Sequence, residues 1–322
     1  MAVTKGLVLG KFMPLHQGHI HLIETAARQV DELTVLVCSI KSEPIPGALR
    51  YGWMKEQFPK LRVLHVTDDN PQVPEDHRFF WEIWVDTIRR NCPEGLDIFF
   101  SSEQYGFELA SRLGIRHVLV DLERKTAPIS ATKIRANAQQ YWQYVPEVVR
   151  PYFCKRVVLT GPESTGKSVL AQKLAAHFDT VFVEEYGRTY CEEHGRDLSP
   201  LDFAHIAGGQ LLLEDEAARK ANQVLFCDTD LIVTQVWAEI FFQYCPPWIR
   251  QASHERRYDL FLLMSPDIPW VDDGTRAFEE VRVKQWKRLR EELESRNLPY
   301  ASISGSFDER LASAVEAVKN IL

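Results

Sequence analysis

The chain has 322 residues, enough for two ordinary domains at roughly 150 residues each, so a single small module is excluded. Hydrophobic residues make up 45% and charged residues 26%, a balance typical of globular proteins that excludes a disordered chain. Lys and Arg number 38 against 45 Asp and Glu, which gives a net charge of -7 and a pI near 5.8. A net negative charge repels DNA and anionic membranes, so we expect the protein to bind neither.

The six cysteines form no C-x-x-C pair, which argues against zinc ribbons and disulfide frameworks and favours a reducing compartment. The N-terminus MAVTKGLVLGKF has too short an apolar run for a signal peptide, and no apolar stretch reaches the 18 or so residues that span a bilayer. We therefore expect a cytoplasmic protein, and the sequence leaves a homo-oligomer open.

Short apolar runs alternate with helix-period stretches along the whole chain, the pattern of parallel sheets covered by helices. Strands are predicted at residues 7–9, 33–40, 61–66, 98–101 and 118–121, and again at 157–160, 181–183, 224–228, 260–264 and 300–304. The predicted fold class is α/β, with two parallel-sheet domains.

The first strand leads into the segment H-x-G-H, which opens a helix. Two histidines, His16 and His19, and a glycine, Gly18, make a compact anion-binding turn at the helix N-terminus. Imidazoles can donate hydrogen bonds to phosphate, and the glycine permits close approach of a ligand to the backbone. Taken alone, the segment is weak evidence, because histidines often simply cap helices.

A second segment, I-S-A-T-K-I-R, opens another helix at residues 129–135. Ser130 and Thr132 offer hydroxyls at the helix start, and Arg135 lies one turn further on. Alone it is a capped helix, but together with H-x-G-H it indicates a triphosphate site. Two prolines within residues 146–154 then interrupt the helical pattern of residues 137–144, so we place the domains at 1–152 and 153–322.

The second domain begins with G-P-E-S-T-G-K-S between a strand and a helix, which matches the P-loop pattern at every fixed position. Its glycines turn backbone N–H groups toward phosphate oxygens, Lys167 holds the β and γ phosphates of ATP, and Ser168 binds Mg²⁺. The predicted phosphate-binding residues of this loop are Gly161, Ser164, Thr165, Gly166, Lys167 and Ser168.

Acidic residues end the next two strands, where ligands of open α/β sheets bind. Glu184 and Glu185 could orient or deprotonate an acceptor hydroxyl, and Asp228 and Asp230 follow a strand at which a carboxylate supports Mg²⁺. The alternative for each pair is a solvated strand end or a helix cap.

A further segment carries Trp270, Asp273 and Arg276, with Arg282 six residues after Arg276. Its arginines could close over the transferring phosphate and Trp270 could stack on a flat ring, or the segment is an ordinary surface turn.

H-x-G-H followed by I-S-x-T-x-x-R resembles the nicotinamide mononucleotide adenylyltransferases of the nucleotidyltransferase superfamily. Fused to G-P-E-S-T-G-K-S, E-E-Y-G-R, C-D-T-D and W-V-D-D-G-T-R, these motifs resemble the bacterial bifunctional NadR proteins over almost the entire chain. The resemblance implies an N-terminal Rossmann-like nucleotidyltransferase and a C-terminal P-loop kinase. It also implies phosphorylation of nicotinamide riboside by ATP, and transfer of AMP from ATP to nicotinamide mononucleotide to give NAD and pyrophosphate.

By this resemblance, His16 and His19 contact the ATP phosphates and stabilise the transition state, while Ser130, Thr132 and Arg135 hold the triphosphate and Lys11 reaches the same phosphates. The aromatic cluster Phe79, Phe80, Trp81 and Trp84 could supply a ring that stacks on nicotinamide, with a helix core as the alternative. In the kinase domain, the resemblance gives the roles described above, in binding phosphate and Mg²⁺ and in activating the acceptor, to Lys167, Ser168, Glu185, Asp228 and Asp230. NadR proteins that repress transcription carry a helix-turn-helix domain first, and we expect that function to be absent here.

Two other interpretations remain at this point. One is an adenylyltransferase joined to a nucleoside kinase with other acceptors, such as a pantetheine-phosphate or flavin enzyme. The other is a pyridine-nucleotide sensor that binds its ligands with little turnover.

Overall fold

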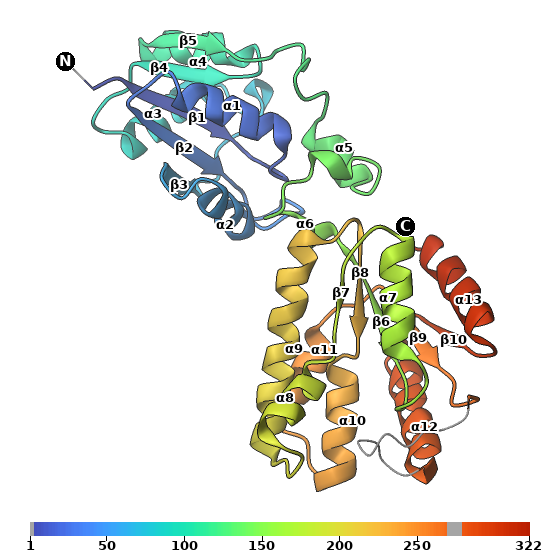
Figure 1. Cartoon of the computed structure of the whole chain (residues 1–322). Coiled ribbons are helices and arrows are strands. Elements are labelled where there is room, and N and C mark those ends of the chain that lie inside the picture. The colour runs from blue at the N-terminus through green and yellow to red at the C-terminus, as the bar shows by residue number, and fades with distance from the viewer. Residues whose placement is uncertain (1–2, 269–278) are drawn as a thin grey trace. The chain divides into compact units, whose positions relative to one another are not determined.

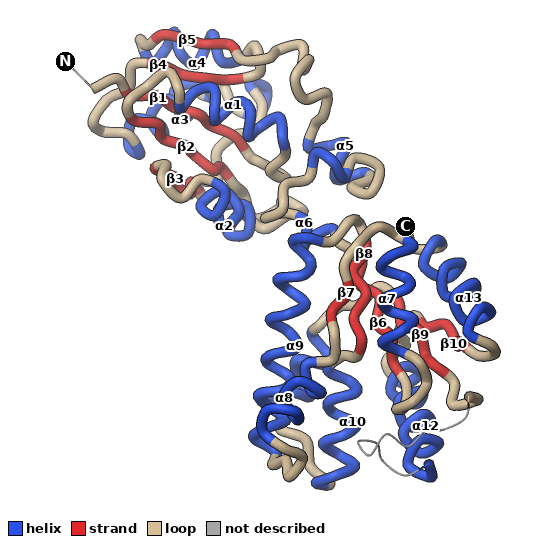
Figure 2. Tube along the Cα trace, viewed as in Figure 1, coloured by secondary structure: helices blue, strands red, loops and turns tan. Residues whose placement is uncertain are grey.

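A computed structural model describes residues 3–268 and 279–322 of the chain. The chain divides into two compact units, Met1–Val149 and Arg150–Leu322, each built on its own sheet (Figures 1 and 2). This division lies three residues before the boundary between 152 and 153 that the sequence analysis placed. In the described part of the chain, no helix combines the length and apolar character needed to cross a bilayer.

The first unit holds a five-stranded parallel sheet with the order β3-β2-β1-β4-β5. Its strands are β1 (Lys5–Gly10), β2 (Glu32–Cys38), β3 (Arg62–Val66), β4 (Ile98–Ser101) and β5 (Arg116–Leu119). Its helices are α1 (Gln17–Ala27), α2 (Gly47–Gln57), α3 (Phe80–Asn91), α4 (Tyr105–Leu113) and α5 (Ala131–Ala136), with short 3₁₀ turns at Pro74–Asp76 and Trp142–Tyr144. The strand order turns back at β1, so the segments that leave β1 and β4 meet at the carboxyl edge, where such sheets bind ligands.

The sheet of the first unit is buried on both faces, as a parallel sheet must be. Leu7, Leu36 and Phe99 belong to one core cluster with side chains of α3 and α4. The alternate residues Val8 and Val35 have no exposed surface either. This double burial explains why the strands are continuous apolar runs in the sequence.

Two predictions in this unit need correction. The fifth strand was predicted at 118–121 but spans Arg116–Leu119, because Gly114 ends α4 in a left-handed conformation and Arg116 N–H already donates to the Asp97 carbonyl. The helical pattern at 137–144 forms no continuous helix, since Asn137 has extended φ and ψ angles and ends α5.

The second unit holds another five-stranded parallel sheet, with the order β10-β9-β6-β8-β7. Its strands are β6 (Lys155–Thr160), β7 (Phe182–Val183), β8 (Val224–Asp228), β9 (Leu260–Met264) and β10 (Tyr300–Ile303). Its described helices are α6 (Arg150–Phe153), α7 (Lys167–His177), α8 (Tyr186–His194), α9 (Pro200–Lys220), α10 (Leu231–Phe242), α11 (Pro247–Glu255), α12 (Glu279–Ser295) and α13 (Phe307–Lys319).

Two apolar clusters support the second unit. Leu170 and Leu174 of α7 and Val318 of α13 pack with buried residues of the sheet, while Phe203 of α9 and Ile249 of α11 belong to a separate cluster of helices. Capping boxes start α9 and α13, where Ser199 and Ser306 each accept from the third helical N–H. The predicted fold class, two parallel-sheet domains, is confirmed.

Candidate active sites

The H-x-G-H turn of the first unit is folded around His16, which is the N-cap of α1. Its Nδ1 accepts hydrogen bonds from the N–H groups of Gly18 at 3.1 Å and His19 at 3.4 Å. A Cβ at Gly18 would lie 3.0 Å from the His16 ring, so any larger residue there would have to displace this ring slightly. The rings of His16 and His19 stack with centroids 3.7 Å apart.

Burial favours the neutral form of both histidines. Burial, reinforced by the charge of Arg124, lowers the pKa of His16 from 6.5 to about 4, and burial together with His16 holds the pKa of His19 well below its usual value. Because Nδ1 of His16 accepts backbone hydrogen bonds, the proton of its neutral ring is on Nε2. His16 is thus a neutral donor for a ligand oxygen, rather than a cation.

A cavity of about 670 Å³ opens beside this turn at the carboxyl edge of the sheet. Lys11, His19, Thr132 and Arg135 line it, together with Phe80, Trp81 and Trp84 of α3. The indole N–H of Trp84 donates to the Pro71 carbonyl at 3.0 Å, which fixes that ring. Phe79, by contrast, is exposed and is not among the lining residues.

Helix α5 contributes the second predicted segment to the same region. Ser130 caps α5 by accepting from Lys133 N–H at 3.3 Å, and the Arg135 guanidinium donates to Thr132 Oγ1 at 3.2 Å and to the Met13 carbonyl. His16, Gly18, Ser130 and Thr132 line a smaller cavity of about 190 Å³, and His19 and Thr132 line both cavities. The structure therefore brings the two sequence motifs together.

Lys11 has a partner that no motif revealed. Its Nζ lies 3.1 Å from Glu43, whose carboxylate also binds Arg50. Arg50 is fully buried and donates to the carbonyl oxygens of Lys11, Cys38 and Ile45. It thus ties together segments that form one wall of the larger cavity.

Two serine–histidine pairs flank the cavity, and each depends on a glycine. Ser39 Oγ lies 2.8 Å from His65 Nε2, and Ser101 Oγ lies 2.9 Å from His117 Nε2. A Cβ at Gly47 would come closer than 3.0 Å to the first pair, and a Cβ at Gly106 would do the same to the second. The first turns of α2 and α4 approach the sheet edge this closely only because both residues lack side chains.

In the second unit, residues 161–166 form the loop between β6 and α7, with left-handed angles at three positions. Gly161, Ser164 and Gly166 have φ values of 141°, 58° and 82°. A Cβ at Gly161 would lie 2.8 Å from the Met264 carbonyl oxygen. Thr165 Oγ1 and Lys167 Nζ both donate to the Pro162 carbonyl, at 2.8 and 3.0 Å, so the lysine lies along the loop.

A buried arginine that the sequence analysis missed holds this loop. Arg310 of α13 is 1% exposed and donates to the Thr165 carbonyl at 3.3 Å, to Gly305 at 2.8 Å and to Ser265 at 3.2 Å, and it pairs with Asp267. No pattern in the α13 sequence distinguishes it from a surface arginine.

The predicted acids occupy different environments. Glu184 is exposed, whereas Glu185 is partly buried, and desolvation raises its pKa despite the nearby charge of Lys167. Asp228 is 2% exposed, and its Oδ1 has no hydrogen-bond partner among the described residues. Ser168 lies in the first turn of α7.

Asp230, a predicted substrate-binding acid of the kinase unit, has no exposed surface. It caps α10 by accepting from Val233 N–H at 3.0 Å, and burial raises its pKa to about 7. This capping matches the helix-cap alternative of the sequence analysis. The other oxygen, Oδ2, has no hydrogen-bond partner among the described residues, and the predicted contact of Asp230 with substrate stays a prediction.

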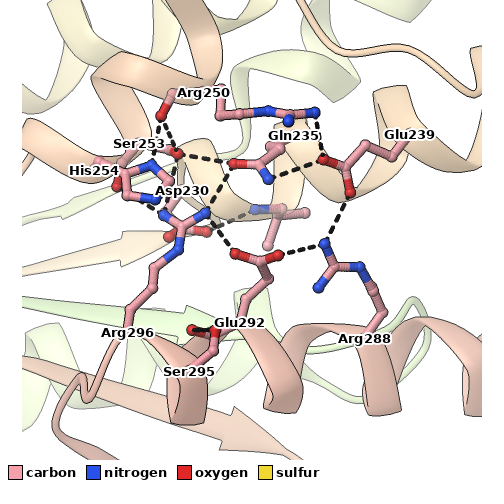
Figure 3. A network of polar contacts seen from close by, with 11 residues as sticks. Asp230, Gln235, Glu239, Arg250, Ser253, His254, Arg288, Glu292, Ser295 and Arg296 are labelled. Atoms are coloured by element: carbon pink, nitrogen blue, oxygen red, sulfur yellow. Dashed lines mark hydrogen bonds and ion pairs between the residues drawn. The ribbon is translucent and has the colours of Figure 1, made fainter.

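A polar network beside Asp230 joins α10, α11 and α12 (Figure 3). Gln235 of α10 accepts from Arg296 at 2.9 Å and from Ser253 of α11 at 2.9 Å, and Glu239 accepts from Arg288 of α12 at 3.1 Å. Helix α12 is therefore anchored to the helix that Asp230 caps.

The last predicted segment is only partly described. Trp270, Asp273 and Arg276 lie outside the described residues. Arg282 of α12 is 4% exposed and donates to the Ile268 carbonyl at 3.4 Å, so its predicted contact with ATP stays a prediction.

Comparisons with known proteins agree with the division into two units. Residues 7–137 match the cytidylyltransferase-like family and residues 156–310 match an AAA domain family. The trifunctional NAD biosynthesis/regulator protein NadR of Escherichia coli is 34% identical over 99% of this chain and 83% of its own length. The chain belongs to the NadR family.

Solved NadR structures extend the match to the fold. A crystal structure of NadR protein in complex with NR has a TM-score of 0.82 and 26% identity, covering 99% of this chain and 96% of that one. A second, in complex with NAD and AMP-PNP, has a TM-score of 0.81 and 26% identity over the same shares. The nicotinamide-nucleotide adenylyltransferase of Pyrococcus furiosus matches 52% of this chain and 96% of its own length at 25% identity. The predicted resemblance to NadR proteins is confirmed.

Proposed function

We propose that this NadR-family protein is a bifunctional enzyme of NAD salvage, with nicotinamide mononucleotide adenylyltransferase activity in residues 1–152 and ribosylnicotinamide kinase activity in residues 153–322. Two phosphate-binding constellations, each at the carboxyl edge of its own parallel sheet, carry the proposal. The NR, NAD and AMP-PNP in the two NadR crystal structures support nicotinamide riboside, NAD and ATP as the ligands.

In the adenylyltransferase unit, the phosphate of nicotinamide mononucleotide attacks the α-phosphorus of ATP and pyrophosphate leaves. The neutral Nε2–H of His16, together with His19, donates to phosphate oxygens as charge develops on them. Lys11, Arg135, Ser130 and Thr132 lie around the two cavities and hold the triphosphate. Trp81 and Trp84 give the large cavity an aromatic wall against which a nicotinamide ring can stack.

In the kinase unit, the P-loop backbone and Lys167 hold the β and γ phosphates of ATP. The 5′-hydroxyl of the riboside attacks the γ-phosphorus, its proton passes to a carboxylate, and ADP leaves. Glu185 is the acid best suited to take this proton, because its raised pKa brings a carboxylate closer to the operating pH.

The kinase residues also fit Mg²⁺. Asp228 offers a buried carboxylate oxygen without a partner among the described residues, and Ser168 offers a hydroxyl in the first turn of α7. Two protein ligands are enough for Mg²⁺, because this ion usually keeps several waters and binds substrate phosphates. When bound, Mg²⁺ would neutralise charge on the β and γ phosphates.

The test is incubation of the purified protein with ATP, Mg²⁺ and nicotinamide riboside, followed by chromatography. Both nicotinamide mononucleotide and NAD are expected. Binding without product would point to a sensor, and turnover of pantetheine phosphate or flavin mononucleotide instead of nicotinamide compounds would point to another acceptor.

A further inference from the structure

The turn that carries Glu185 lacks the usual internal support. Glu185 is the N-cap of α8, but its side chain makes no capping hydrogen bond. The first N–H groups of a helix need acceptors, and an N-cap side chain commonly provides one. The first N–H groups of α8 are therefore left for other acceptors.

One of these acceptors is Gln210, on the neighbouring helix α9. Its Oε1 accepts a hydrogen bond from the N–H of Tyr186 at 3.0 Å, and the Gln210 residue is 1% exposed. Tyr186 follows Glu185 directly, so this bond fixes the peptide unit that joins the two residues. A neighbouring helix thus takes over the capping role that Glu185 leaves open.

The adjacent residue of α9 holds the Tyr186 ring. A Cβ at Gly209 would lie closer than 3.0 Å to ring atoms of Tyr186, so the ring rests against the α9 backbone at this point. A Cβ at Gly208, one residue earlier, would meet no atom within 4 Å. Gln210 therefore holds the backbone of Tyr186, and Gly209 contacts its ring. Of the two glycines, only Gly209 has a steric reason to be glycine.

We propose that Gln210 is a positioning residue for riboside phosphorylation, which holds the Tyr186 N–H and thereby sets the place of the Glu185 carboxylate. The inference rests on the proposed kinase function and on Glu185 as the proton acceptor. Small displacements of a reacting group are costly, since a shift of about 1 Å can reduce a rate on the order of a hundredfold. The effect of losing this bond should therefore appear in kcat rather than in substrate binding.

The first experiment compares Gln210→Leu with Gln210→Glu. Leucine removes the acceptor, whereas glutamate keeps an oxygen at the same reach. Gln210→Leu should lower kcat for the riboside by roughly ten- to a hundredfold, with the KM values for riboside and ATP within about twofold of wild type. Gln210→Glu should restore kcat to within about threefold of wild type. Adenylyl transfer to added nicotinamide mononucleotide serves as an internal control in each preparation and should not change.

The second experiment uses the two glycines as a matched pair. Gly209→Ala should reduce kcat as Gln210→Leu does, because the added methyl group displaces the Tyr186 ring, while Gly208→Ala should leave kinase kinetics unchanged. Both substitutions change helix propensity alike, so their difference reports the contact with Tyr186. If thermal unfolding shows that Gln210→Leu does not fold, the difference in kcat between Gly209→Ala and Gly208→Ala tests whether α9 positions Tyr186.

The proposal is overturned if Gln210→Leu retains wild-type kcat, if Gln210→Glu falls as far as Gln210→Leu, or if the riboside KM rises with kcat unchanged. Equal behaviour of Gly209→Ala and Gly208→Ala also overturns it. Failure of the proposed function looks different, since the wild-type protein would then phosphorylate no riboside at all.

Discussion

The imidazole rings of His16 and His19 stack 3.7 Å apart, and both carry a pKa below the usual value for histidine. Two positive charges at this separation would repel each other, and burial removes the water that would screen them. The turn that we propose to bind phosphate therefore offers oriented N–H dipoles, while Lys11 and Arg135 place fixed charges at the cavity wall.

This arrangement predicts that His16 does not titrate near neutral pH. In an NMR titration, the ring resonance of His16 can be assigned as the one that is missing in a His16→Asn variant. Its chemical shift should stay constant from about pH 8 to pH 6 and change only as the pH nears 4. Because the folded pKa lies below the unfolded value of 6.5, the stability that neutral His16 contributes is complete above 6.5 and is lost as the pH falls toward 4. A midpoint near 6.5 would contradict the burial argument.

The two activities should be separable by single substitutions, because each site is built within its own unit. Lys167→Ala removes the charge that holds the β and γ phosphates and should abolish riboside phosphorylation, while NAD still forms from added nicotinamide mononucleotide. His19→Ala should lower adenylyl transfer by roughly 10²- to 10³-fold and let the mononucleotide accumulate from riboside. Both rates are measured on both variants, with folding checked by thermal denaturation. If either folded variant loses both reactions, the two-site model is wrong.

Trp84 should contribute to mononucleotide binding more than to chemistry. Its ring lines the large cavity and is fixed by the hydrogen bond to Pro71. Trp84→Ala should raise the KM for nicotinamide mononucleotide by roughly two- to thirtyfold, the range expected for loss of stacking on a cationic ring. Phe79→Ala is the control, since Phe79 lies on the same stretch but is exposed and does not line the cavity. An equal effect of both substitutions would assign Trp84 to the helix core.

Arg310 should be needed for the stability of the kinase unit. Arg310→Met leaves the carbonyls of Thr165, Ser265 and Gly305 without this donor, at a cost of about 2–5 kcal/mol of unfolding free energy. The KM for ATP should rise in the same variant because the P-loop loses an anchor. Arg290→Met is the matched control, an exposed arginine paired with Glu294 within α12, and denaturant unfolding should not distinguish it from wild type. Similar unfolding curves for the two variants would refute the anchoring role.

The sequence predicted all ten strands because each contains a short apolar run. Burial is complete in strands such as β8 and β9, whereas β5 at the sheet edge has no fully buried residue. The largest difference between predicted and observed strand bounds is at β5, because its run of apolar residues continues past the last residue that pairs with β4. Motifs also pointed to the two proposed phosphate sites, since the chemistry of H-x-G-H and of the P-loop is local in the chain.

The supporting residues could not be predicted in this way. Arg310 reaches Thr165 across 145 positions of the chain, Arg50 reaches Lys11 across 39, and Gln210 reaches Tyr186 across 24. Such contacts exist only once the helices have packed, and a lone Arg or Gln in a helix carries no signal of them. The capping role of Asp230 could not be predicted either, because an acid at a strand end and an acid at a helix N-cap look identical in sequence.

The glycines at the starts of α2 and α4 restrict which amino-acid substitutions the first unit can accept. Gly47 faces the Ser39–His65 pair and Gly106 faces the Ser101–His117 pair, and in both places a methyl group would collide with a hydroxyl and an imidazole. A saturation library selected for NAD synthesis should therefore be depleted of every replacement at these two codons, alanine included, while Gly52 within α2, whose Cβ would meet nothing within 4 Å, accepts substitution freely.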